Sequence, residues 1–177
     1  MISVFLSYPK PFNTEQEVFI EQVISYLKHR GFEPRTLGVS DYDVNEPLSA
    51  IRRLMLESNG ILVVAFRRTL IEKGVYKPKS KSDEKILNNS WITSPYTQIE
   101  PAMAFQIGLP ILILRENGVL ADGILERGVI GTYMPEFSLE DVATDYFSTP
   151  EWNQLIGIWE GNVRSVVKTK GTPPKLF

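Results

Sequence analysis

The stretch Ile61-Leu62-Val63-Val64-Ala65-Phe66, in the middle of the chain, is a continuous apolar run rich in β-branched residues. A similar run, Ile2 to Ser7, opens the sequence, and another, Ile111 to Leu114, follows Pro110. Runs of this length and composition are typical of strands that are buried on both faces of a parallel sheet. The three runs therefore predict the centre of a parallel β-sheet.

Helical patterns alternate with these strands. Between the first two runs, apolar residues recur at helical spacing up to Leu27, with Asn13 or Thr14 as candidate N-cap and Gly31 at the end. Further helices are predicted at 47–58, 101–107 and 151–168, and further strands at 32–37 and 131–134. Five strands that alternate with helices predict an α/β fold with a flavodoxin-like, open, doubly wound, parallel five-stranded sheet and helices on both faces.

The composition limits the classes of function. The 177 residues carry 19 basic and 21 acidic side chains, a net charge of -2, which gives no reason to expect nucleic acid or a membrane surface as a partner. Because there is no cysteine and only one histidine, thiolate and His-rich metal sites are excluded, and we expect no metal. No secretory signal and no apolar run of about 20 residues is present, which predicts a cytoplasmic protein. We expect one domain at 1–170 and a C-terminal tail at 171–177.

Residues 67–90 interrupt the alternation of strands and helices. They carry seven basic and three acidic side chains, a net charge of +4, which leaves -6 on the remainder of the chain. Connections longer than about 12 residues are uncommon in compact domains and are either functional or mobile. This basic connecting segment is predicted to be either a solvated insertion or a flap over the site, in which Lys77, Lys79 and Lys81 would attract an anion.

Glu100 is the candidate catalytic residue. The nucleophile elbow, the phosphate loop and the dinucleotide-binding glycine motif are missing from the sequence, which disfavours ordinary hydrolases, kinases and dehydrogenases. Pro101 disfavours a helical conformation at Glu100, so we expect this carboxylate at a kink or a helix start, among apolar neighbours. There it could stabilise a cationic sugar, as carboxylates do in glycoside cleavage. Alternatively, a glutamate in a first helical turn interacts only with the helix dipole.

Five segments in order resemble the Toll/interleukin-1 receptor (TIR) domain family over most of the chain. The decisive segment reads Ser94-Pro95-Tyr96-Thr97-Gln98-Ile99-Glu100 and has the spacing of the family signature Ser-x-Trp-Cys-x-x-Glu. The other four are similar to the first-strand box, the second-box loop, the third strand with its preceding serine, and the Gly-x-Pro entry to the fourth strand. They are Val4 to Tyr8, Asp41 to Ile51, Glu57 to Val64 and Gly108 to Leu112.

The resemblance implies an enzyme that cleaves the nicotinamide–ribose bond of NAD, with Glu100 as the catalytic residue. Nicotinamide leaves as a neutral base, so a single carboxylate can suffice. The products would be nicotinamide and ADP-ribose or a cyclic ADP-ribose-type signal, as in nucleotide signalling or antiviral defence. NAD would be the substrate, and no cofactor is implied. The resemblance also implies that the substrate cleft is lined by Phe5, Ser7, Tyr8, Phe12, Asp43, Pro47, Tyr96 and Thr97, with residues 9–13 extending its wall.

Two other functions remain open on the same residues. A non-catalytic TIR interaction module would assemble through the second-box loop and the last helix. The related nucleoside 2-deoxyribosyltransferase group also has a glutamate opening a helix that leads into a Gly-x-Pro strand, and it would use Glu100 as a covalent nucleophile. For partners, the resemblance implies self-association or a separately encoded signalling protein, in addition to NAD or a related nucleotide.

Overall fold

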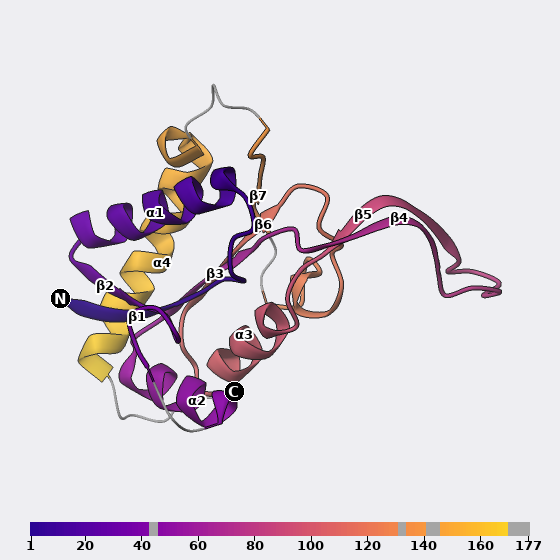
Figure 1. The fold of residues 1–177 in the computed structure, drawn as a ribbon. Helices are drawn as coiled ribbons and strands as arrows, with labels where there is room; N and C mark the ends of the chain where they lie inside the picture. The colour runs from indigo at the N-terminus through magenta and orange to yellow at the C-terminus, as the bar shows by residue number, and fades with distance from the viewer. Residues whose placement is uncertain (43–45, 131–133, 141–145, 170–177) are drawn as a thin grey trace.

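A five-stranded parallel sheet forms the centre of the protein (Figure 1). The computed structural model describes residues 1–42, 46–130, 134–140 and 146–169. The strand order is β2-β1-β3-β6-β7, and each neighbouring pair is parallel. The strands are β1 (Ile2–Ser7), β2 (Phe32–Arg35), β3 (Ile61–Ala65), β6 (Ile111–Glu116) and β7 (Glu136–Phe137). The predicted open, doubly wound α/β sheet is therefore confirmed.

Helices cover both faces of the sheet. They are α1 (Thr14–His29), α2 (Pro47–Glu57), α3 (Tyr96–Gln106) and α4 (Pro150–Thr169). Figure 1 shows α1 and α4 on one side and α2 and α3 on the other. Side chains alternate along each strand, so Leu62 and Val64 pack with α1 and α4, whereas Ile61 and Val63 pack with α2 and α3. The two cores explain why the central strands are apolar at every position.

The ends of α1 follow the sequence closely. The Asn13 side chain accepts a hydrogen bond from the backbone N–H of Gln16 at 2.9 Å, which satisfies one of the free donors of the first turn. Gly31 follows the helix with a φ of 84°, a conformation that glycine adopts without strain. Both predicted end signals of this helix are confirmed.

Helix α3 begins earlier than the sequence predicts. The expected start was Pro101, but the helix runs from Tyr96 and contains both Glu100 and Pro101. The preceding turn already satisfies the first N–H groups, since Thr97 and Gln98 donate to the carbonyls of Ser94 and Pro95. Pro101 is buried in the helix interior, so packing outweighs the local preference against a helix before proline. Glu100 therefore lies in the second turn and not at the helix start.

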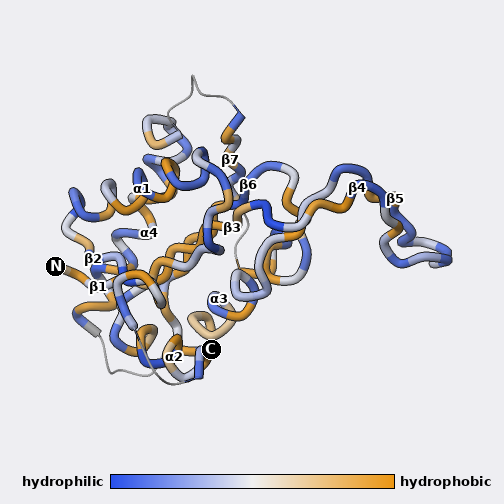
Figure 2. Tube along the Cα trace, viewed as in Figure 1, coloured by the Kyte–Doolittle hydropathy of each residue, from blue (hydrophilic) through white to orange (hydrophobic). Residues whose placement is uncertain are grey.

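The basic segment is a β-hairpin. Strands β4 (Thr69–Tyr76) and β5 (Lys85–Ile92) pair antiparallel, with Thr69 opposite Ile92. Figure 1 shows the hairpin projecting away from the sheet, and Figure 2 shows that its outer part is largely hydrophilic. The sequence pattern predicts no strand within residues 67–90, and the structure shows that two paired strands make up most of this segment.

Two further predictions concern the end of the chain. The fifth strand of the sheet lies at β7, after the predicted 131–134, of which 131–133 lie outside the described residues. The predicted tail at 171–177 also lies outside them. Among the helices that the structure describes, none combines the length and the hydrophobicity that crossing a bilayer requires.

Candidate active site

A cavity of about 320 Å³ lies where the chain changes direction between the central strands. From β1, one crossover leads to β2 and the next leads to β3 on the other side. In open α/β sheets such a switch point leaves a crevice outside the carboxyl ends of the strands, and ligands bind there. The cavity is lined by Ser7, Tyr8, Pro9, Lys10, Leu37, Pro47, Ile51, Arg68, Ser94, Tyr96, Thr97 and Glu100.

Among the described residues that line this cavity, Glu100 carries the acidic side chain. It is 8% exposed, and its Oε2 accepts a hydrogen bond from the hydroxyl of Ser7 at the end of β1. Burial raises the pKa of the Glu100 carboxyl from 4.5 to about 7, while the hydrogen bond from Ser7 acts in the opposite direction. A carboxyl group with such a pKa, in a cavity, is a candidate catalytic group.

The turn before α3 positions this carboxylate. The carbonyl of Ser94 accepts hydrogen bonds from both the backbone N–H of Thr97 (3.1 Å) and its hydroxyl (2.6 Å). The hydroxyl of Ser94 accepts a third bond from the N–H of Tyr96 at 3.3 Å. Because these bonds fix the first turn, they also fix the direction in which Glu100 leaves the second turn. Thr97 thus holds the turn together, at the position that corresponds to Cys in the TIR signature that this segment resembles.

The structure brings most of the predicted cleft residues together. Ser7, Tyr8, Pro47, Tyr96 and Thr97 line the cavity with Glu100. Burial raises the pKa of the Tyr8 phenol, while a hydrogen bond with Thr36 lowers it. Tyr8 therefore remains a neutral hydrogen-bond donor at physiological pH.

Three predicted cleft residues do not join them. Phe5 is 1% exposed and packs in the core beneath α2, because it lies two residues before the end of β1 and the helix covers it; its assignment to the cleft is wrong. Phe12 is exposed, and its ring stacks on Trp91 with centroids 6.5 Å apart, outside the cavity lining. Asp43 lies outside the described residues.

Two cations, Lys10 and Arg68, line the cavity. Lys10 belongs to residues 9–13, the predicted extension of the cleft wall, whereas Arg68 is not among the predicted cleft residues. Each follows the carboxyl end of a central strand, β1 or β3, and this placement was the available signal. Both side chains are exposed, and neither forms an ion pair within the described part of the chain. By contrast, Lys77, Lys79 and Lys81 lie between the two hairpin strands and do not line this cavity. These three lysines therefore do not form a flap over the Glu100 cavity.

A second buried carboxylate, Glu116 on β6, has a structural explanation. Burial raises the pKa of this carboxyl, but hydrogen bonds from the backbone N–H of Arg67 (2.8 Å) and from Gln16 Nε2 (3.0 Å) lower it. The guanidinium of Arg67 lies 3.7 Å away. These partners occupy the carboxylate. Glu116 on β6 thereby contacts α1 and the segment that follows β3, which gives it a structural role.

Comparison with protein-family models gives no match, and comparison with curated protein sequences gives none either. Among solved structures, the chain is similar to the CMP N-glycosidase BcmB of Clostridium botulinum, with 16% identity and a TM-score of 0.49 over 89% of this chain and 98% of that chain. It is also similar to the TIR domains of the activated Roq1 resistosome, with 14% identity and a TM-score of 0.42 over 95% and 84% of the two chains. The chain is similar as well to the flavoenzyme NAD(P)H:(acceptor) oxidoreductase FerB of Paracoccus denitrificans, with 10% identity and a TM-score of 0.38 over 94% of this chain and 97% of that chain.

Proposed function

We propose that the protein is an N-glycosidase that cleaves the nicotinamide–ribose bond of NAD or a related nucleotide, with Glu100 as the catalytic residue. The products are nicotinamide and ADP-ribose, or a cyclic ADP-ribose-type molecule. The observation that supports this proposal is the buried carboxyl of Glu100 at the switch point of the sheet, with the hydroxyl of Ser7 as its hydrogen-bond partner among the described residues.

The chemistry follows from the environment of this carboxylate. In the described part of the chain, no cationic group pairs with the Glu100 carboxylate. A buried carboxylate of this kind favours a ligand that brings positive charge, and the pyridinium ring of NAD does so. When the C1′–N bond breaks, its electron pair neutralises the ring nitrogen, and the positive charge moves to the ribose. Glu100 then stabilises the ribosyl cation, while Ser7 holds the carboxylate in position. Water adds to C1′ and loses a proton, or a nucleophile of the substrate itself adds and closes a ring.

The rim of the cavity suits the remainder of such a substrate. Lys10 and Arg68 are exposed cations, and ammonium and guanidinium groups are common partners of phosphate oxygens. Their charge also balances the repulsion that Glu100 would exert on an anionic dinucleotide. The cavity therefore offers a carboxylate to the reacting sugar and cations to the phosphates.

The test compares wild-type protein with Glu100→Gln during incubation with NAD, with nicotinamide separated by chromatography. Gln keeps the size of the side chain but cannot carry the charge, so we expect turnover to fall by about 10²-fold or more. Glu21→Gln, an exposed change on α1, is the matched control and should release nicotinamide like wild type. Equal release by wild type and Glu100→Gln would contradict the proposed role.

Two parallel measurements address the other functions. Deoxyribonucleosides in the same assay test the transferase reaction, in which Glu100 would form an ester with the sugar. Base exchange with deoxyribonucleosides and none with NAD would replace the proposed reaction. Concentration-dependent self-association without any turnover would indicate an interaction module.

A further inference from the structure

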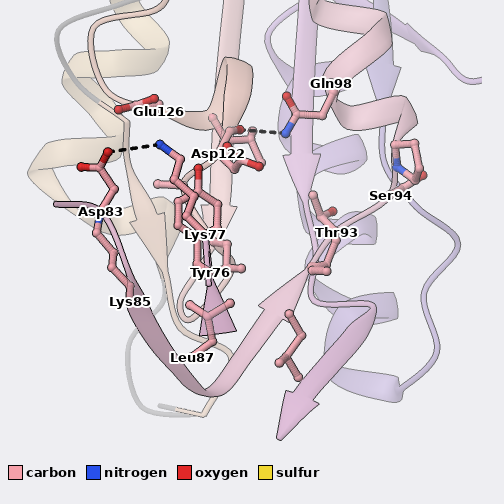
Figure 3. A pocket seen from close by; sticks show the side chains of 16 residues that line it. Tyr76, Lys77, Asp83, Lys85, Leu87, Thr93, Ser94, Gln98, Asp122 and Glu126 are labelled. Carbon is pink, nitrogen blue, oxygen red and sulfur yellow. Dashed lines mark hydrogen bonds and ion pairs between the residues drawn. The ribbon is translucent and has the colours of Figure 1, made fainter. Parts of the chain in front are cut away.

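A second cavity, of about 540 Å³, lies between the β4–β5 hairpin and residues 120–126 (Figure 3). We call it the hairpin pocket. Its size is within the range of pockets that bind small organic molecules. The apolar part of its wall includes Leu87 and Ile92 from the hairpin and Leu120 from the opposite side. The polar part includes the carboxylates of Asp122 and Glu126 and the ammonium group of Lys85. Apart from Ser94, the described residues that line this pocket have no role in the function proposed above.

Thr93 indicates that this pocket takes a polar ligand. Its side chain lines the pocket and is labelled in Figure 3. The residue is 6% exposed, and its Oγ1 has no hydrogen-bond partner among the described residues. Buried hydroxyl groups normally have a partner, and leaving one unpaired costs free energy. A ligand with a hydrogen-bonding edge would supply that partner.

The hairpin pocket adjoins the Glu100 cavity. Ser94 lines both of them. Arg68, which lines the Glu100 cavity, donates its backbone N–H to the carbonyl of Ile92, which lines the hairpin pocket, at 3.1 Å. A single extended ligand can therefore reach from one pocket to the other past the base of the hairpin, where Arg68 supplies a positive charge.

Hydrogen bonds hold the two walls of the hairpin pocket together. The backbone N–H of Trp91 on β5 donates to the carbonyl of Gly118 (3.0 Å), and the backbone carbonyl of Trp91 accepts from the N–H of Leu120 (2.9 Å). From α3, Gln98 donates to the carbonyl of Asp122 (2.8 Å) and accepts from the N–H of Ile124 (2.9 Å). The pocket is thus built before any ligand arrives, which reduces the ordering cost of binding.

We propose that the hairpin pocket binds the distal nucleoside of a dinucleotide whose scissile glycosidic bond lies against Glu100. This inference rests on the proposed function and adds the second half of its substrate. The apolar wall suits the face of a base, and the Thr93 hydroxyl suits its polar edge. The carboxylates of Asp122 and Glu126 accept hydrogen bonds from amino or ribose hydroxyl groups, as carboxylates do in other dinucleotide sites. The phosphates between the nucleosides lie beside Arg68.

Binding of AMP, measured by titration calorimetry, tests the pocket without any turnover. Wild type and Glu100→Gln should bind AMP equally, since Glu100 does not line the hairpin pocket. Leu87→Trp fills the pocket and should weaken AMP binding by roughly tenfold or more. Ile86→Trp, on the neighbouring residue that is 74% exposed and outside the lining, is the matched control and should bind like wild type. Thr93→Val keeps the shape but removes the hydroxyl, and it should weaken binding severalfold.

Steady-state kinetics then tests the bridging of the two pockets. Leu87→Trp should raise the KM for NAD by roughly tenfold and leave the cleavage of nicotinamide mononucleotide unchanged, because the mononucleotide lacks the distal half. No AMP binding by wild type, or equal binding by Leu87→Trp, would overturn the inference. If neither substrate is cleaved while AMP binds as expected, the proposed reaction fails and the hairpin pocket stands as a nucleotide site.

Discussion

The carboxyl group of Glu100 is expected to titrate near neutral pH. Because burial raises its pKa to about 7, part of the population carries a neutral carboxyl at neutral pH. Only the ionised form stabilises a ribosyl cation. We therefore expect kcat/KM for NAD to rise with pH through an inflection near 7, since this ratio reports the groups of the free enzyme. A profile of initial rates across this range checks the prediction, and a flat profile would contradict it.

The same carboxyl should make folding stability depend on pH. Its pKa is raised from 4.5 to about 7, so the folded state holds the proton more tightly than the unfolded state. Its contribution to stability is complete below the lower value and is lost as the pH rises through the higher one. We expect Glu100→Gln to gain stability over wild type as the pH rises, by about 3 kcal/mol in total. Urea unfolding of both proteins at several pH values measures this gain, and a pH-independent difference would contradict the assignment.

For individual residues, the sequence predicts the catalytic candidate Glu100 more reliably than it predicts the residues that surround Glu100 in the cavity. Glu100 could be found because Ser94, Thr97 and Glu100 lie within seven consecutive residues at the start of α3, and their spacing is visible in the chain. Arg68 could not be assigned, and Lys10 could be assigned only as part of residues 9–13, because their place beside Glu100 depends on the order of the strands. Phe5 was misassigned because an apolar residue near a strand end can face a cleft or a covering helix, and its local sequence is the same in both cases.

The β4–β5 hairpin is the element that is hardest to predict from the sequence. Continuous apolar runs in the sequence predict the central strands of the parallel sheet. In contrast, β4 and β5 are mostly exposed and carry many charged and polar side chains. Lys77 and Lys79, which follow β4, have φ values of 49° and 66°, which lysine rarely adopts. A turn without glycine or asparagine at such positions lacks the usual hairpin signal.

We expect the outer hairpin to be dispensable for folding. Removing residues 74–87 and joining Lys73 to Asn88, which are opposite each other, through an Asn-Gly turn should shorten the hairpin without changing its base. The removed apolar side chains are largely exposed, with Val75 at 51% and Ile86 at 74%. Thermal unfolding should therefore shift by only about 3 °C or less, whereas AMP binding should be lost with Leu87. A much larger shift would show that the outer hairpin supports the core.

The charge of the whole molecule is unevenly distributed. The net charge of -2 is the sum of +4 on residues 67–90 and -6 on the rest of the chain. The cations Lys10 and Arg68 of the Glu100 cavity therefore form a local positive patch on a protein that is negative overall. Attraction of an anionic substrate to such a patch is local and is screened by salt. We expect the KM for NAD to rise severalfold between roughly 50 and roughly 500 mM salt.

Variants locate this effect within the molecule. Lys10→Gln and Arg68→Gln should each raise the KM at low salt and reduce its dependence on salt. The double change Lys79→Gln with Lys81→Gln removes two positive charges, one more than each cavity variant, from hairpin residues that line neither pocket, so it should change the KM little. If the double variant weakened binding as much as the cavity variants, net charge and not local contact would control substrate capture.

The hydrogen bond between Ser7 and Glu100 joins residues that are 93 positions apart. This bond cannot form until β1 has paired with β3 and α3 has packed on the sheet. Contacts between residues so far apart in the sequence form slowly during folding. The hairpin, whose strands are connected directly, can pair much earlier. During synthesis and refolding, one wall of the hairpin pocket is therefore expected to exist before the Glu100 carboxyl is in place. Activity would be the last property that the chain acquires, and an incompletely folded molecule would consume no nucleotide.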